Sequence, residues 1–170
     1  DAVICLFLGL SILFSCTSAS PDLRAYYYPV EELSDGLVYH YSSTSNGVDG
    51  LDHFWFFKSH QIEDASQLTG QFYDHNRQTL QYFRQRITNS GALLDEYRLY
   101  TPDSIAQTIP VKVIYNNVYP WDGSDTTAVY LYKLEYQEPD NNAVNTITRN
   151  RRYAGTTSWT FNDITYPAIR

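Results

Sequence analysis

Recurring turn-forming stretches constrain this chain most strongly, because they divide it into short segments rich in Tyr, Thr, Val, Ile and Phe. β-Branched and aromatic residues are the ones favoured on a pleated surface. Short segments of this kind bounded by Gly, Asn, Asp and Ser predict a sandwich or a barrel. The sequence therefore predicts an all-β fold. The turn stretches lie at 34–36, 45–47, 89–91, 122–124, 139–142 and 154–155.

Ten segments are predicted to be strands, and short links join most of them. Short links between consecutive strands predict one antiparallel meander of about 8–10 strands, whose sheet could curl into an open barrel or pack as a two-sheet sandwich. Segment 127–137 alternates clearly: Ala128, Tyr130, Tyr132, Leu134 and Tyr136 share one face, and the other face turns polar halfway. The ten segments are 37–43, 53–60, 67–74, 79–88, 93–101, 108–118, 127–137, 144–152, 157–162 and 164–169.

Residues 2–14 form an uncharged apolar run of 13 residues ahead of the predicted strands. A membrane-spanning helix needs about 20 such residues, whereas a run of about 7–15 matches the hydrophobic region of an export signal. A buried core helix is the alternative, but it would carry a polar face, which this run lacks. Residues 1–15 are therefore predicted to be a signal peptide that forms a short hydrophobic helix. Because the chain has no Met and its last residues still look like a strand, we expect both ends to be truncated.

The apolar run ends in Leu13, Phe14, Ser15 and Cys16, which resemble the lipobox of bacterial lipoprotein signals. The resemblance implies that the Cys16 thiol carries diacylglycerol and that cleavage follows Ser15. Cys5 lies inside the signal, so Cys16 is the only thiol of the mature chain and has no partner for an internal disulfide. Residues 16–25 are predicted to be the lipidated Cys and a flexible tether, and residues 26–170 the β domain.

A second resemblance concerns the start of the domain. The segments 27–30, Tyr-Tyr-Pro-Val, and 36–41, Gly-Leu-Val-Tyr-His-Tyr, resemble the opening of envelope lipoproteins with lipocalin-like or lipoprotein-carrier-like barrels. This resemblance favours a curled, lipocalin-like open barrel over the two-sheet sandwich. The chain as a whole resembles uncharacterised small lipoproteins of Bacteroidetes-type bacteria. This resemblance implies an outer-membrane protein held by its lipid and carries no known activity. No acidic run follows Cys16, which favours the periplasmic face over the cell surface.

The charge and the titratable residues narrow the function further. A net charge of −7 argues against nucleic acid as a partner, because an acidic domain repels phosphate backbones. The four histidines lack metal-ligand spacing, the carboxylates are scattered rather than paired across a motif, and no nucleophile elbow is present. The sequence therefore predicts no metal, no cofactor and no catalysis.

The aromatic and basic residues supply the candidate binding sites. A face that carries Tyr130, Tyr132 and Tyr136 suits a partly wet wall, because each buried hydroxyl in a dry core needs a partner. These tyrosines and Trp121, which is expected to be partly exposed, are the candidate ligand-binding residues, with core filling as the alternative. Arg149 and Arg151 share one face of an extended strand and are the candidate anion-binding residues, with salt bridging inside an acidic domain as the alternative.

Three functions follow from these observations. The favoured one is a lipid-anchored, non-catalytic binding or assembly module with an unknown protein or small-molecule partner. The alternatives are a carrier that holds an apolar ligand inside a barrel cavity and an enzyme that acts on carbohydrate or peptidoglycan. A filled interior would favour the first, a cavity of several hundred cubic ångströms the second, and a cleft with two facing carboxylates the third.

Overall fold

A computed structural model describes residues 21–63, 65–102, 106–124 and 130–170 of the chain. More than half of these residues lie in strands, and the described helices are two short 3-10 turns, η1 (Arg24–Tyr26) and η2 (Val30–Leu33). The predicted all-β class is therefore confirmed. The predicted signal helix over residues 1–15 and the lipidation site Cys16 lie outside the described residues.

Eight strands form one antiparallel sheet in the order β1-β4-β5-β6-β7-β8-β9-β10, which confirms the predicted meander. The hairpin of β2 and β3 is inserted after β1, and the hairpin of β11 and β12 follows β10. The strands are β1 Leu37–Tyr41, β2 Thr44–Ser45, β3 Val48–Asp49, β4 His53–Ile62, β5 Ala65–Tyr73, β6 Thr79–Ile87, β7 Gly91–Tyr100, β8 Thr108–Pro120, β9 Tyr130–Gln137, β10 Val144–Arg151, β11 Thr156–Phe161 and β12 Ile164–Ile169. Every one of the ten predicted segments overlaps a strand, whereas β2 and β3 were not predicted.

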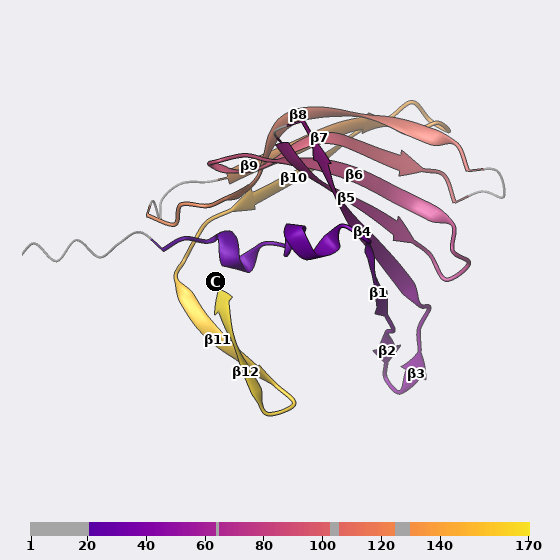
Figure 1. Cartoon of the computed structure of the whole chain (residues 1–170). Helices are drawn as coiled ribbons and strands as arrows, with labels where there is room; N and C mark the ends of the chain where they lie inside the picture. The colour runs from indigo at the N-terminus through magenta and orange to yellow at the C-terminus, as the bar shows by residue number, and fades with distance from the viewer. Residues whose placement is uncertain (1–20, 64, 103–105, 125–129) are drawn as a thin grey trace, which may run out of the picture.

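The two faces of the eight-stranded sheet differ in chemistry. One face carries ion pairs across β6 and β7, in which Arg84 and Arg98 both contact Glu96, and Arg86 contacts Asp95 at 3.3 Å. The opposite face carries the aliphatic and aromatic core together with some polar side chains, and Figure 1 shows that the sheet bends so that this face becomes concave. Strand side chains alternate between the faces, so one set faces the solvent and the other forms the core. The buried core comprises Leu33, Phe57, Leu68, Phe83, Leu94 and Leu134.

The N-terminal segment, residues 22–33, is the second layer of the domain. Figure 1 shows it lying under the arch of the sheet. Leu33 of η2 is 1% exposed and belongs to the core cluster. Leu23 is also buried, and its backbone N–H donates to the Trp121 carbonyl at 2.8 Å. Contacts with the sheet therefore begin within residues 16–25, the stretch that was predicted to be a tether. Residues 16–20 of that stretch lie outside the described residues.

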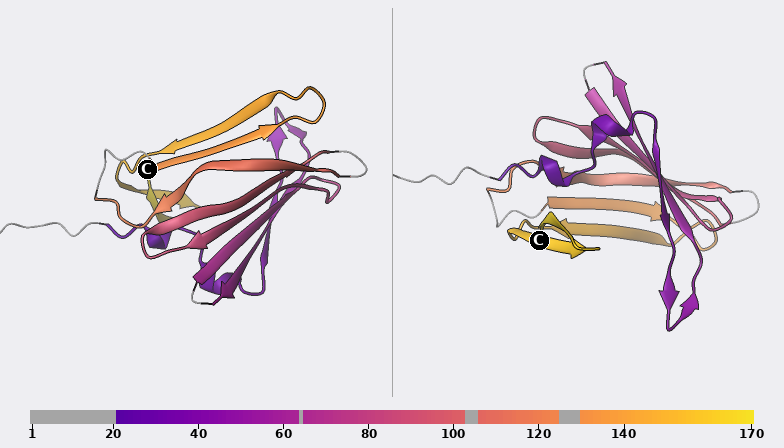
Figure 2. Two further views of the ribbon diagram at one scale, coloured as in Figure 1. Left: turned by 90° about the horizontal axis from the view of Figure 1, so that it is seen from above. Right: turned by 60° about the horizontal axis from the view of Figure 1, so that its bottom comes forward.

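The hairpin of β11 and β12 extends away from the β10 side of the sheet (Figure 2). Most of its side chains are exposed, including those of Trp159, Phe161, Ile164 and Tyr166. The rings of Trp159 and Phe161 stack on one another with their centroids 5.5 Å apart. The hairpin therefore packs mainly against itself. Within the described residues, no helix is long and apolar enough to cross a membrane.

Candidate functional site

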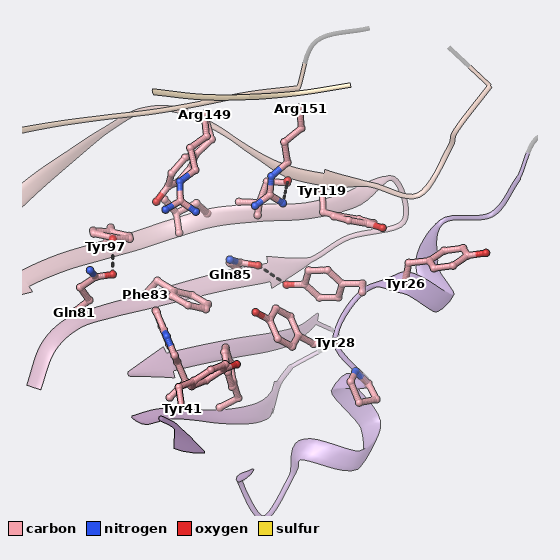
Figure 3. A pocket seen from close by; sticks show the side chains of 17 residues that line it. Tyr26, Tyr28, Tyr41, Gln81, Phe83, Gln85, Tyr97, Tyr119, Arg149 and Arg151 are labelled. Carbon is pink, nitrogen blue, oxygen red and sulfur yellow. Dashed lines mark hydrogen bonds between the residues drawn. The ribbon is translucent and has the colours of Figure 1, made fainter. Parts of the chain in front are cut away.

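A pocket of about 550 Å³ lies on the concave face of the sheet (Figure 3). Residues 26–29 of the N-terminal segment form one wall, and the inward side chains of β1, β4 and β6–β10 form the rest. Seven of the 17 lining residues are tyrosines. The pocket, which we call the concave pocket, therefore has an aromatic lining with many hydroxyl groups.

The pairing of β9 with β10 brings the two predicted sets of site residues together. Arg149 lies directly opposite Tyr132 and Arg151 directly opposite Tyr130 in the antiparallel register. Directly opposed residues project from the same face of a sheet. Tyr132, Arg149 and Arg151 accordingly all line the concave pocket. The sequence analysis proposed two separate sites for these residues, and the structure places them in one pocket.

The other predicted ligand-binding residues lie elsewhere. Tyr136 is half-buried on the same face of β9 but does not line the pocket, and the side chain of Tyr130 lies outside the described residues. Trp121 is only 5% exposed, so the expectation of partial exposure is wrong for this residue. Its indole N–H donates to the Thr88 carbonyl at 2.7 Å, and its ring packs against Tyr27. Trp121 thus supports the pocket wall from behind.

Two glutamines of β6 hold tyrosines of the pocket in place. The Tyr27 hydroxyl donates to Gln85 Oε1, and the Tyr97 hydroxyl donates to Gln81 Oε1 at 2.9 Å. Gln85 is only 7% exposed, so its carbonyl depends on the tyrosine for a hydrogen bond. The sequence analysis missed these glutamines. The available signal was their alternation with Phe83, which puts two amides on an otherwise aromatic face.

The Tyr119 hydroxyl has no such partner. Its oxygen is buried and makes no hydrogen bond to any other described residue. A buried hydroxyl without a partner costs free energy. Burial raises the pKa of Tyr119 to about 12, although the positive charge of Arg151 acts in the opposite direction. The hydroxyl therefore keeps its proton at neutral pH and is available to donate.

Burial also raises the pKa of Tyr27, Tyr97 and Tyr132, which line the same pocket. The cause in each case is desolvation, which penalises the charged phenolate. The neighbouring arginines lower each of these pKa values, but they do not outweigh burial. The pocket therefore presents neutral hydroxyl donors rather than phenolates.

The two arginines of the pocket lack acidic partners in the part of the chain that the structure describes. Arg151 Nη1 donates to the Val118 carbonyl at 3.2 Å, and neither Arg149 nor Arg151 forms an ion pair with a described carboxylate. None of the described lining residues is Asp or Glu. Salt bridging within the described domain therefore does not account for this pair.

The described lining also contains no His. The His40 imidazole contacts Asp52 at 3.0 Å outside the pocket. Among the described residues, no group of three or more His, Cys, Asp and Glu is placed to hold a metal ion. The described lining can hydrogen-bond, stack on and electrostatically hold a ligand, but it does not supply a carboxylate pair.

Comparison with known proteins adds no family. No protein-family model, no curated protein and no solved structure matches the chain. The concave pocket is therefore the observation from which a function is proposed.

Proposed function

We propose that this chain is a lipid-anchored protein of the bacterial cell envelope whose β domain binds a small molecule, without catalysis, in the concave pocket. The observation that carries the proposal is the pocket itself, at about 550 Å³. Pockets for small ligands typically measure about 300–1,000 Å³ and are mostly apolar, with a few placed polar groups. In this proposal the sheet is an open half-barrel, and residues 26–29 cover part of its mouth.

A ligand carrier fits the pocket better than the other two functions considered. A pure assembly module would have a concave face filled by side chains, whereas this face leaves room for a ligand. A glycosidase-type enzyme would place two carboxylates across the cleft, and no described lining residue is a carboxylate. The ligand is expected to present a flat or apolar surface, because Trp55, Phe83 and Tyr97 offer their rings to it.

Fluorescence of a neutral aryl probe, N-phenyl-1-naphthylamine, tests the proposal. Trp55 lines the pocket, whereas Trp159 lies on the exposed hairpin. We expect saturable binding with energy transfer from tryptophan to the probe, and we expect Trp159→Phe to retain that transfer. The matched variant Trp55→Phe should lose part of it and keep the part that comes from Trp121, whose ring packs against Tyr27 of the pocket wall. Transfer that is lost in Trp159→Phe and kept in Trp55→Phe would place the probe on the hairpin and contradict the proposal.

The lipid anchor is tested separately. Full-length protein expressed with labelled palmitate is expected to carry the label, because Cys16 follows a lipobox-like signal. The Cys16→Ala variant should be unlabelled, whereas Cys5→Ala, a matched change inside the signal, should be labelled normally. Equal membrane partitioning of Cys16→Ala and the unaltered protein would overturn the anchor. Protease treatment of intact cells then separates the periplasmic face, which we favour, from the cell surface.

A further inference from the structure

We propose that the ligand of the concave pocket is an amphipathic organic anion, with its acidic group held by Arg149 and Arg151 and its apolar body against the aromatic wall. This inference rests on the proposed function and specifies its ligand class. Its starting point is the contrast between the arginines of the two faces. Arg84, Arg86 and Arg98 each contact a carboxylate on the outer face. Arg149 and Arg151 have no such partner among the described residues.

The position of the two arginines suits a single anionic group. They lie two residues apart on β10, so their side chains leave the same face about 7 Å apart along the strand. Figure 3 shows both side chains extending from β10 into the pocket. A guanidinium offers a planar fork of donors that matches the geometry of a carboxylate, sulfonate or phosphate. Two such forks on one wall define an anion site. Although the chain has a net charge of −7, no described carboxylate lines this site.

Tyr119 also lines the pocket, and its buried hydroxyl lacks a hydrogen-bond partner among the described residues. Figure 3 shows this hydroxyl pointing away from Arg149 and Arg151. An anionic group held by the two arginines therefore does not reach it, and the anion site is assigned to the arginines alone. The ring of Tyr119 belongs to the aromatic lining of the pocket.

The aromatic lining of the pocket determines the second part of the ligand, its apolar body. The rings of Trp55, Phe83 and Tyr97 also line it, and Tyr97 contacts Tyr132 edge-on with centroids 6.4 Å apart. Aromatic side chains provide large apolar contact areas with a polar tip. A small inorganic anion would leave these rings unused, so the observations favour an acid with an aryl or alkyl body.

A matched pair of fluorescent probes tests this inference. The compound 1-anilinonaphthalene-8-sulfonate has the same aryl body as N-phenyl-1-naphthylamine and adds one sulfonate. For the double variant Arg149→Gln/Arg151→Gln, the ratio of sulfonate-probe affinity to neutral-probe affinity should fall about tenfold or more, because charge-assisted hydrogen bonds are lost. Arg152→Gln, which removes one positive charge from a neighbouring residue outside the pocket lining, should leave the ratio unchanged.

A salt titration of the unaltered protein gives a second measurement that needs no variant. Added salt should weaken binding of the sulfonate probe and not of the neutral probe, because salt screens exposed charges. Equal salt dependence, or an unchanged affinity ratio in the double variant, would overturn the anion inference while leaving the proposed pocket function standing. Failure of both probes to bind the unaltered protein would instead overturn the proposed function. Displacement by decanoate but not by decanol would support a carboxylate as the natural anionic group.

Discussion

The concave face of the sheet and the hairpin of β11 and β12 are both aromatic-rich antiparallel structures, yet their side chains differ in burial. Phe57 on β4 is 4% exposed, whereas Phe161 on β11 is 55% exposed. Phe57 packs edge-on or stacked against Tyr39 and Trp55 and also approaches Phe83. Phe161 stacks only on its own hairpin neighbour Trp159 among the described ring contacts.

The difference lies in what covers each surface. The N-terminal segment covers the concave face, and Leu33 from that segment completes its core. The hairpin has two strands and exposed side chains on both of its faces. Two-stranded hairpins are at best marginally stable alone in water. Alternating aromatic residues thus suffice to form a strand in both regions, but burial requires a second layer from elsewhere in the chain.

The largest expected effect comes from the matched phenylalanines. Phe57→Ala should destabilise the domain by about 3–5 kcal/mol, because it removes a buried ring and leaves a cavity in the core. Phe161→Ala should change stability by no more than about 0.5 kcal/mol, as expected of an exposed site. Urea unfolding of the purified protein measures both. Similar losses for the two variants would mean that the hairpin is packed as tightly as the sheet.

A matched pair of tyrosines gives the intermediate effect. Tyr27→Phe removes the hydroxyl that donates to the buried Gln85 carbonyl, so we expect a loss of about 1–3 kcal/mol. Tyr166→Phe on the exposed hairpin should be nearly neutral. The same unfolding measurement applies, and the variant Tyr27→Phe/Gln85→Leu should recover part of the loss. No recovery would indicate that the loss in Tyr27→Phe does not come from leaving the Gln85 carbonyl unpaired.

The smallest effect is the alkaline pH dependence of stability. The folded protein raises the pKa of Tyr119 to about 12, above the unfolded value of 10.0, so the folded state retains this proton longer. The contribution to stability is complete below the unfolded pKa and is lost as pH rises through the folded pKa. Unfolding measured between about pH 9 and 12 should therefore show falling stability, with a shallower slope in Tyr119→Phe. An identical slope in that variant would argue against a buried Tyr119 hydroxyl.

Local pattern was enough to predict the strands. Segment 144–152 was predicted as a strand and became β10, because it contains several β-branched residues and turns bound it on both sides. The face of segment 127–137 that carries Tyr132 was also identified correctly as one side of β9. The strands β2 and β3 were missed because two-residue strands carry no period; only their turn, with positive φ at Asn46 and Gly47, was visible in the sequence.

The site was harder to predict, because it depends on which strands become neighbours. Tyr132 and Arg149 were each identified, but nothing local indicates that β9 and β10 set them directly opposite one another. Trp121 was misjudged because its burial depends on long-range contacts of its ring with Tyr27 and of its indole N–H with Thr88. The role of residues 26–29 as a pocket wall was missed for the same reason: this link between η1 and η2 gains its function only from the sheet that it covers.

The attachment of the chain at Asp22 has a mechanical consequence. Asp22 forms a β-bridge with Asp122, and the adjacent Leu23 is both buried and hydrogen-bonded to Trp121. This clamp precedes the pocket wall at residues 26–29 in the chain. Tension that arrives along the chain from the N-terminal side meets the clamp first and passes into the sheet at β8. In the proposed lipid-anchored protein, the wall would therefore keep its position over a bound ligand when the chain ahead of it is pulled.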